Sequence, residues 1–169
     1  MSIEIYVGLP GAGKSLKTAQ LILEKLQDNL RWARKTYQHR KSMEKEAEKK
    51  GMTYEQLCDV TYKDKNEAVF YKRFPVFRKV YSNMKLNVEI EEQYSEFIRY
   101  WSEPEELVVM RDCDVFIDEI AAYFDATQWA NMPLDMKRWL QQHRKHGIDI
   151  VGNTQDFPMI DVSMRRLAS

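Results

Sequence analysis

The sequence lacks the features that mark secreted, membrane-spanning or metal-stapled proteins. Its two cysteines, Cys58 and Cys113, form neither a disulfide framework nor a zinc-ligand spacing, and they fit a reducing compartment. No apolar run approaches the roughly 18 residues that a membrane-spanning helix needs. The N-terminus has neither the basic region nor the long apolar core of a signal peptide. These absences predict a soluble, intracellular chain.

An excess of charge of either sign is also missing. The 26 basic residues are balanced by 26 acidic ones, so the whole chain gives no argument for a polyanionic partner, and any nucleic-acid surface has to be local. The length of 169 residues, 44% of them hydrophobic, allows one domain with a real core and no second full one. We therefore expect residues 1–169 to form a single domain.

The N-terminal residues carry the most specific pattern. Ile3, Ile5 and Val7 form a short β-branched run that predicts a strand. From Ser15 the period changes to three and four residues, which predicts an amphipathic helix whose apolar positions are Leu16, Ala19, Ile22, Leu26 and Leu30. Between the two lies a match to the phosphate-loop pattern G-x-x-x-x-G-K-[ST], in the order strand, loop, helix that this motif requires.

The chemistry of this loop follows from its residue types. Glycines let backbone N–H groups turn inward around phosphates, and the following helix N-terminus adds partial positive charge. Lys14 is expected to reach the β and γ phosphates, and the Ser15 hydroxyl to bind Mg²⁺. The predicted nucleotide-binding residues are Gly8, Leu9, Pro10, Gly11, Ala12, Gly13, Lys14, Ser15 and Leu16. The alternative, a glycine-rich turn with an incidental lysine, is disfavoured by the flanking strand and helix.

A second acidic element follows an apolar strand predicted over 114–117. Asp118 would hold the Mg²⁺ shell beside Ser15, and Glu119 would polarise the attacking water as a general base. Two solvated acids at a strand end are the alternative, which the phosphate loop makes less favoured. A small-molecule kinase must exclude a water-activating base, so Glu119 favours a hydrolase or motor. The modest chain length and Pro10 in the loop keep such a kinase open as a second hypothesis.

The remaining segments predict further strands and helices that alternate, as in a parallel sheet covered on both faces. A charge-dense stretch, 31–50, opens a helical excursion over 31–73, with a capping box at Thr53 and Gln56. Strands are expected at 76–82 and 148–151, and helices at 91–101, 133–146 and from 164. The basic stretch, with Trp32 and Tyr37 interleaved, could be a nucleic-acid arm. A solvated helix face is the reading that the sequence favours.

A resemblance to a known family enters at the C-terminal motifs. Asp118-Glu119, Tyr123-Phe124, Gln128-Trp129, the run 139–150 (Trp-Leu-Gln-Gln-His-Arg-Lys-His-Gly-Ile-Asp-Ile) and Gln155-Asp156 resemble, in this order, the zonular occludens toxin family. That family includes assembly ATPases of filamentous bacteriophages. The resemblance covers the first 30 residues and about 110–169. The segment 31–78 matches nothing in it and is interpreted as a helical insertion.

The resemblance implies a RecA-like P-loop NTPase core that uses ATP and Mg²⁺ at the cytoplasmic face of the bacterial inner membrane. It implies a homo-oligomeric ring that works with phage assembly proteins and single-stranded phage DNA during export. Family members continue into a transmembrane part, so the chain is interpreted as an N-terminal fragment without it. Gln155 would sense the γ-phosphate or position water, and Arg165 or Arg166 would act on a neighbouring subunit's site. A nucleotide-stabilised assembly scaffold with little turnover is the non-enzymatic alternative.

Overall fold

The computed structural model describes residues 1–61 and 78–168, and the chain divides into two compact units. The first unit comprises Met1–Leu26 and Arg78–Ser169, and the second comprises Gln27–Phe77. The long helix α1 (Lys14–Lys49) contributes residues to both units. Each unit is described by itself below.

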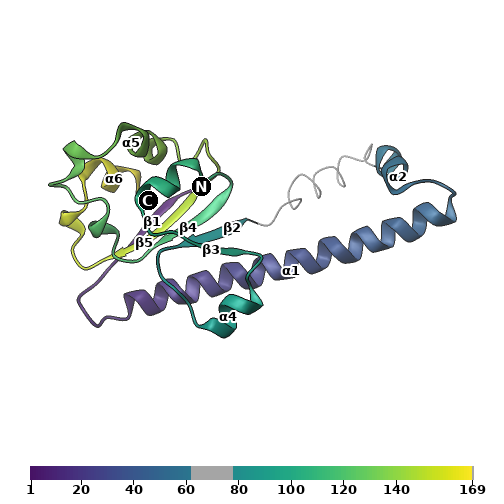
Figure 1. Ribbon diagram of the computed structural model, residues 1–169, viewed down its shortest axis with the longest axis horizontal. Coiled ribbons are helices and arrows are strands. Elements are labelled where there is room, and N and C mark those ends of the chain that lie inside the picture. The colour runs from purple at the N-terminus through teal and green to yellow at the C-terminus, as the bar shows by residue number, and fades with distance from the viewer. Residues whose placement is uncertain (62–77, 169) are drawn as a thin grey trace. The chain divides into compact units, whose positions relative to one another are not determined.

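The first unit is built on a five-stranded sheet in which every neighbouring pair is parallel (Figure 1). The strand order is β1-β5-β4-β2-β3. The strands are β1 (Ile3–Val7), β2 (Lys79–Ser82), β3 (Ile98–Tyr100), β4 (Cys113–Ile117) and β5 (Asp149–Thr154). Parallel pairing requires crossover connections, and here these carry helices. The predicted α/β class, with a parallel sheet of the P-loop NTPase type, is confirmed.

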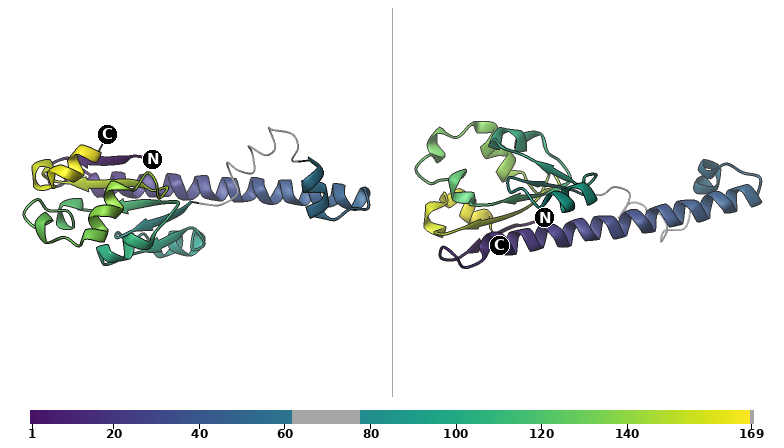
Figure 2. Two further views of the ribbon diagram at one scale, coloured as in Figure 1. Left: turned by 90° about the horizontal axis from the view of Figure 1, so that it is seen from above. Right: turned by 60° about the horizontal axis from the view of Figure 1, so that its bottom comes forward.

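Helices cover both faces of this sheet. The segment of α1 up to Leu26 lies on one face, while α5 (Leu134–Gln141) and α6 (Val162–Leu167) lie on the other (Figure 2). The remaining helix of this unit is α4 (Val88–Gln93), and short 3₁₀ turns occur at η1 (Pro104–Val109), η2 (Ile120–Ala122), η3 (Trp129–Asn131) and η4 (Phe157–Met159). The expected three-layer arrangement is therefore present.

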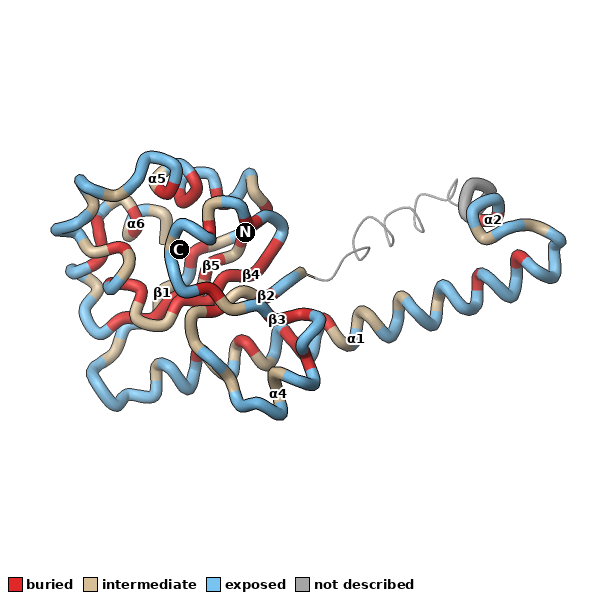
Figure 3. The backbone as a smooth tube through the Cα atoms, viewed as in Figure 1, coloured by how far each residue is buried: buried red, intermediate tan, exposed pale blue. Residues whose placement is uncertain are grey.

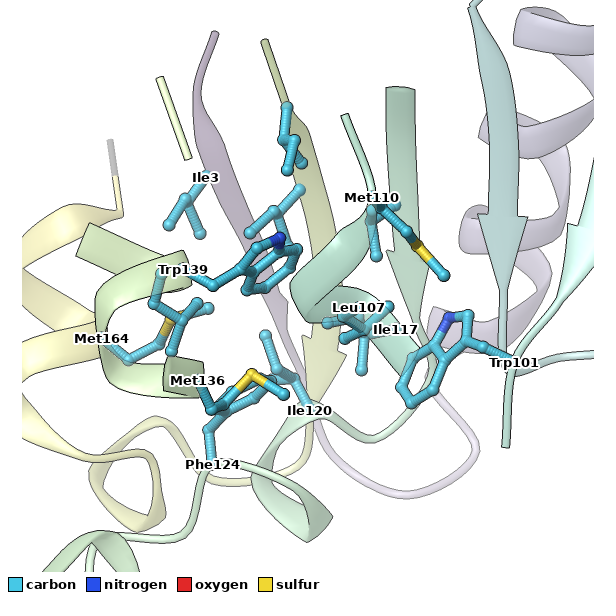
Figure 4. Close-up of a cluster of buried hydrophobic side chains, with 14 of the residues drawn as sticks. Ile3, Trp101, Leu107, Met110, Ile117, Ile120, Phe124, Met136, Trp139 and Met164 are labelled. Atoms are coloured by element: carbon cyan, nitrogen blue, oxygen red, sulfur yellow. The ribbon is translucent and has the colours of Figure 1, made fainter. Parts of the chain in front are cut away.

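The main core lies between the sheet and the layer formed by η1, α5 and α6. All five residues of β4 are buried, as expected for a central strand with helices on both faces (Figure 3). Trp139 and Met136 of α5 point into a cluster with Ile117 of β4, Ile120 of η2 and other buried residues (Figure 4). Burial also raises the pKa of the Cys113 thiol to about 12, which keeps it a neutral core residue.

Two predicted helices differ from the structure. The helix expected over 91–101 is wrong: α4 ends at Gln93, and Ile98–Tyr100 form strand β3 beside β2. Long-range pairing with β2 outweighs the local helical pattern there. The helix expected over 133–146 is shorter, because α5 ends at Gln141 and turns lead on to Gly147 at φ +72°.

The inner face of α1 also differs from the predicted one at its start. Leu16 is 76% exposed, whereas Thr18, Ile22 and Leu26 are fully buried. Leu16 therefore does not belong to the buried stripe, and a polar residue, Thr18, takes the first inward position. The reason is the site described below, where the Thr18 hydroxyl has a buried hydrogen-bond partner.

In the second unit, the C-terminal half of α1 packs against α2 (Tyr54–Thr61). Met43 and Ala47 bury their side chains with Leu57, beside a half-buried Tyr54. The predicted capping box is confirmed: Thr53 N donates to Gln56 Oε1 at 2.9 Å, and Gln56 N donates to Thr53 Oγ1 at 3.2 Å. The part of the predicted helical excursion beyond residue 61, and residues 76–77 of the predicted strand, lie outside the described residues.

Within 1–61 and 78–168, the structure contains no helix with both the length and the apolar character required to cross a bilayer.

Candidate functional site

The phosphate loop connects the carboxyl end of β1 to the first turn of α1. Gly11 and Gly13 have φ values of +76° and +78°, a region that residues with a Cβ rarely adopt. The loop closes on itself through Ala12 N, which donates to Leu9 O at 3.1 Å. Both glycines are therefore required by the backbone conformation that forms this loop.

The Lys14 ammonium lies over its own loop. Its Nζ donates to Gly8 O at 2.7 Å and to Leu9 O at 3.0 Å. The side chain is half-buried and forms no ion pair with a carboxylate among the described residues. Its charge is thus held at the loop mouth by neutral carbonyl groups, which an anion can replace.

The acidic pair lies at the carboxyl end of β4, separated from β1 by β5. Ser15 Oγ donates to Asp118 Oδ1 at 2.9 Å, a contact that joins the two predicted motifs across 103 residues of sequence. A hydroxyl and a carboxylate are hard oxygen ligands of the kind that Mg²⁺ takes alongside phosphate oxygens and water. No group of three or more His, Cys, Asp or Glu side chains within the described ranges could hold a metal by itself. The oxygen pair fits Mg²⁺ brought in with a nucleotide.

Glu119 turns away from the strand with a left-handed backbone, at φ +53° and ψ +63°. This conformation is uncommon for a residue with a side chain, and it persists where surrounding contacts enforce it. Its carboxylate accepts from Thr154 Oγ1 at 3.3 Å and from Gln155 N at 3.4 Å, and Gln155 Nε2 approaches Glu119 Oε2 at 3.5 Å. The turn therefore directs Glu119 toward the end of β5 and the predicted sensor residue.

Asn153, near the end of β5, connects the loop helix to the acidic pair. Its side chain is 1% exposed. Its Nδ2 donates to Asp118 Oδ1 at 2.6 Å and to the buried Thr18 Oγ1 at 2.9 Å, and its Oδ1 accepts from Glu119 N at 3.1 Å. A buried amide that uses both its oxygen and its nitrogen fixes the groups around it.

Asn83 forms hydrogen bonds to the same acidic turn from the end of β2, the other neighbour of β4. It follows β2 directly, and its Oδ1 accepts from Asp118 N at 2.7 Å while its Nδ2 donates to Asp118 O at 2.9 Å. The same Nδ2 lies 3.3 Å from the Tyr123 hydroxyl oxygen. Both backbone polar groups of Asp118 are therefore set by one side chain.

These elements surround a cavity of about 360 Å³, a volume within the range of ligand sites. Its lining includes six loop and helix residues, together with Glu119 and Gln155: Pro10, Gly11, Gly13, Lys14, Ser15, Leu16, Glu119 and Gln155. Leu16 is exposed because it faces this cavity and not the core. Glu119 and Gln155 thus meet part of the predicted loop around one opening. Gly8, Leu9, Ala12 and Asp118 are not in the lining, and Asp118 is joined to it through its contact with Ser15.

The two predicted arginines do not line this cavity. Arg165 is half-buried on α6, with its guanidinium over the Phe157 ring at 5.8 Å and its buried Nε without a hydrogen-bond partner among the described residues. Arg166 is exposed. A role for either arginine in another subunit's site stays a prediction.

The sequence interpretation gave no role to Asn83, Asn153 or Thr18. A signal existed for the two asparagines, because both occur at the carboxyl ends of strands, where ligands bind in parallel α/β sheets. No comparable signal marked Thr18, a polar residue on an otherwise apolar helix face.

A family model described as "Zonular occludens toxin (Zot)" matches residues 2–169. Among solved structures, the crystal structure of the N-terminal domain of zonular occludens toxin from Neisseria meningitidis is similar, with 18% sequence identity and a TM-score of 0.49. The match covers 99% of this chain and 73% of that chain. No curated protein matches the chain.

Proposed function

The chain belongs to the zonular occludens toxin family, and from this premise we propose that it is a Mg²⁺-dependent ATPase that drives filamentous phage assembly and export of single-stranded DNA. The observation that carries the enzymatic part is the hydrogen bond from Ser15 Oγ to Asp118 Oδ1. This bond places the phosphate loop next to a carboxylate. A hydroxyl and a carboxylate side by side are the residue types that bind the metal of a nucleoside triphosphate.

The loop residues bind and orient the triphosphate. Inward backbone N–H groups of the loop and the N-terminus of α1 hold phosphate oxygens. Lys14 leaves the carbonyls of Gly8 and Leu9 and places its ammonium on the β and γ phosphates. Ser15 and Asp118 would hold Mg²⁺, and the ion would supply positive charge against the phosphates.

Glu119 acts as the general base. Its carboxylate lines the cavity, so it can accept a proton from a water that attacks the γ-phosphate. Gln155, exposed at the mouth of the same cavity, orients that water or contacts the γ-phosphate. A base in this position promotes transfer to water, which disfavours the kinase alternative.

The test is ATP turnover by the purified chain with and without Mg²⁺, together with a Glu119→Gln variant. We expect Glu119→Gln to bind a fluorescent ATP analogue as tightly as wild type while its turnover falls about 100-fold or more, the usual size of a lost general base. Glu96→Gln is the matched control, since Glu96 is exposed and lies outside the cavity lining.

Three results would count against this proposal. Equal turnover in Glu119→Gln and wild type removes Glu119 from the mechanism. Rapid phosphoryl transfer to a nucleoside or nucleotide supports the kinase. Tight nucleotide binding with negligible turnover, at high protein concentration and with single-stranded DNA present, supports a scaffold.

The place of action that we propose is the cytoplasmic face of the bacterial inner membrane, in a homo-oligomeric ring with other phage assembly proteins. In such a ring Arg165 or Arg166 would neutralise transition-state charge at a neighbour's site. Turnover per protomer should then rise with protein concentration, and Arg166→Ala or Arg165→Ala should abolish the rise. A rate strictly proportional to protein concentration would contradict action between subunits.

A further inference from the structure

The second unit contains a one-sided distribution of charge along α1. Six basic side chains recur at intervals of three and four residues, or their sums, so they share one side of the helix. They are Arg31, Arg34, Lys35, Lys41, Lys45 and Lys49, and all six are exposed. This basic stripe is about 27 Å long, at about 1.5 Å of rise per residue.

Acidic residues of α1 form few ion pairs with the stripe, and exposed Glu48, three residues after Lys45, forms none with a described residue. Between Asp28 and Glu44, a part of α1 that the structure describes completely, there is no Asp or Glu. Glu44 and Glu46 are paired with Arg40 at 3.0 Å and Lys50 at 2.6 Å, and neither cation belongs to the stripe. Among the described residues, Arg31 is the one stripe member in an ion pair, with Asp28 at 2.8 Å.

Folding of the second unit does not use this side of the helix. Met43 and Ala47, which pack with Leu57, lie on the side of α1 opposite the basic stripe. Figure 3 shows the outer part of α1 as mostly pale-blue, exposed backbone with a few buried positions. A solvated helix usually mixes charges at i,i+4 spacing, which lowers repulsion. The basic side chains of the stripe therefore repel one another, as expected of a surface that binds a polyanion.

An exposed aromatic side chain borders the stripe. Tyr37 is 66% exposed and lies three residues after Arg34 and four before Lys41. It is the one large hydrophobic side chain that is exposed between residues 27 and 57, all of which are described. A ring flanked by cations can stack on an unpaired base while its neighbours contact phosphates.

We propose that the basic stripe, together with Tyr37, binds single-stranded nucleic acid. A bilayer is the less suitable anionic partner, because a membrane-surface helix needs an apolar face to insert, and that of α1 is packed against α2. A duplex leaves no free base for Tyr37. The proposal that the stripe binds single-stranded nucleic acid does not depend on the proposed function. Only the identification of that nucleic acid as exported phage DNA does.

The experiment measures binding of the 169-residue chain to a fluorescein-labelled 20-mer of thymidylate by anisotropy, over a series of salt concentrations and without nucleotide. The triple variant Arg34→Gln, Lys41→Gln, Lys45→Gln should bind about tenfold or more weakly at low salt. Its slope of log K against log salt should fall by about 2, from three lost phosphate contacts at roughly 0.7 each. Glutamine retains helix propensity, and circular dichroism checks that α1 remains formed.

The matched control removes one arginine and two lysines elsewhere, as Lys85→Gln, Arg144→Gln, Lys145→Gln. These residues are exposed and form no ion pair with a described residue. The control should bind like wild type. An equal loss in both triple variants would show a general charge effect and would overturn the proposal.

A second variant tests the aromatic contribution. Tyr37→Leu should weaken binding to the thymidylate 20-mer about tenfold and leave binding to an abasic strand of equal length unchanged. Tighter binding to a duplex, or binding to anionic phosphatidylglycerol vesicles without binding to the oligonucleotide, would overturn the inference. Because no ATP is present, these outcomes are independent of whether the chain hydrolyses it.

Discussion

Acidic residues lie at the amino ends of β4 and β5 and at the carboxyl end of β4, and their partners differ between the two edges of the sheet. At the amino ends, Arg78 Nη2 contacts Asp149 Oδ2 at 2.9 Å and Asp114 Oδ1 at 3.3 Å. Lys25 Nζ adds a contact to Asp114 at 3.5 Å, and the N-terminal ammonium lies 3.4 Å from Asp149. At the carboxyl end of β4, Asp118 and Glu119 have no cationic partner among the described residues.

The difference separates charges that hold the fold from charges that await a ligand. Asp114 is almost fully buried, with 4% of its side chain exposed, and it needs cations within the protein because a buried unpaired carboxylate is costly. Asp118 and Glu119 are half-buried and receive neutral donors alone, from Ser15, Asn153 and the end of β5. In the proposed function, these carboxylates are the groups that would hold a metal cation and accept a proton.

The strongest way to break this comparison is to remove the cation at the amino end. Arg78→Met should lower the free energy of unfolding by about 3 kcal/mol, because it leaves the buried Asp114 with one exposed lysine as partner. Urea denaturation measures the change. Arg144→Met, at an exposed arginine outside this network, should cost less than about 0.5 kcal/mol. A similar loss in both variants would mean that the amino-end charges do not hold the fold.

Sequence reasoning succeeded where a structural signal is local. The strand, glycine loop and helix at the N-terminus are adjacent in sequence, and the three residues before Asp118, 115–117, are apolar, so the sequence predicts both motifs. That Ser15 meets Asp118 follows from the parallel sheet, since carboxyl ends of parallel strands share one edge. Thr53 and Gln56 form their capping box within four residues, and it was predicted correctly.

Sequence reasoning failed where the deciding contact is distant. Ile98–Tyr100 form a strand because β2 lies beside them, which periodicity does not encode. Asn83 contacts Asp118 across 35 residues, and Asn153 contacts Thr18 across 135. The basic run of α1 was visible in the sequence, but its segregation from acidic residues became evident only once the helix bounds and ion pairs were known.

A subtler change at the carboxyl end would sharpen the comparison. Asn83→Ala frees both backbone polar groups of Asp118, so the carboxylate is less well placed for Mg²⁺. We expect turnover at fixed Mg²⁺ to fall about tenfold and to recover partly at high Mg²⁺, with metal-free nucleotide affinity unchanged. A Mg²⁺ titration of the steady-state rate measures this.

Asn87→Ala is the control for Asn83→Ala. Asn87 caps α4 by accepting from Glu89 N, so its loss weakens a helix end and leaves the acidic turn intact. The Mg²⁺ dependence of turnover should therefore remain that of wild type. If Asn83→Ala lowers the rate without altering the Mg²⁺ dependence, Asn83 does not act through Asp118.

The smallest expected effect is that of Asp118→Asn on stability, and comparing it with Asp114→Asn contrasts the carboxyl and amino ends of β4 directly. Asp118→Asn should change the free energy of unfolding by less than about 1 kcal/mol without metal, because lost hydrogen-bond strength from Ser15 and Asn153 is offset by relief of repulsion with Glu119. Asp114→Asn should destabilise the chain by about 2 kcal/mol, since Arg78 and Lys25 lose charge-assisted contacts to a buried carboxylate while both cations remain partly solvated. Adding Mg²⁺ with ATP should raise the melting temperature of wild type and of Asp114→Asn, and should have little effect on Asp118→Asn. Differential scanning fluorimetry of the three proteins decides the matter, and equal destabilisation by the two substitutions would mean that Asp118 serves the fold rather than a bound metal.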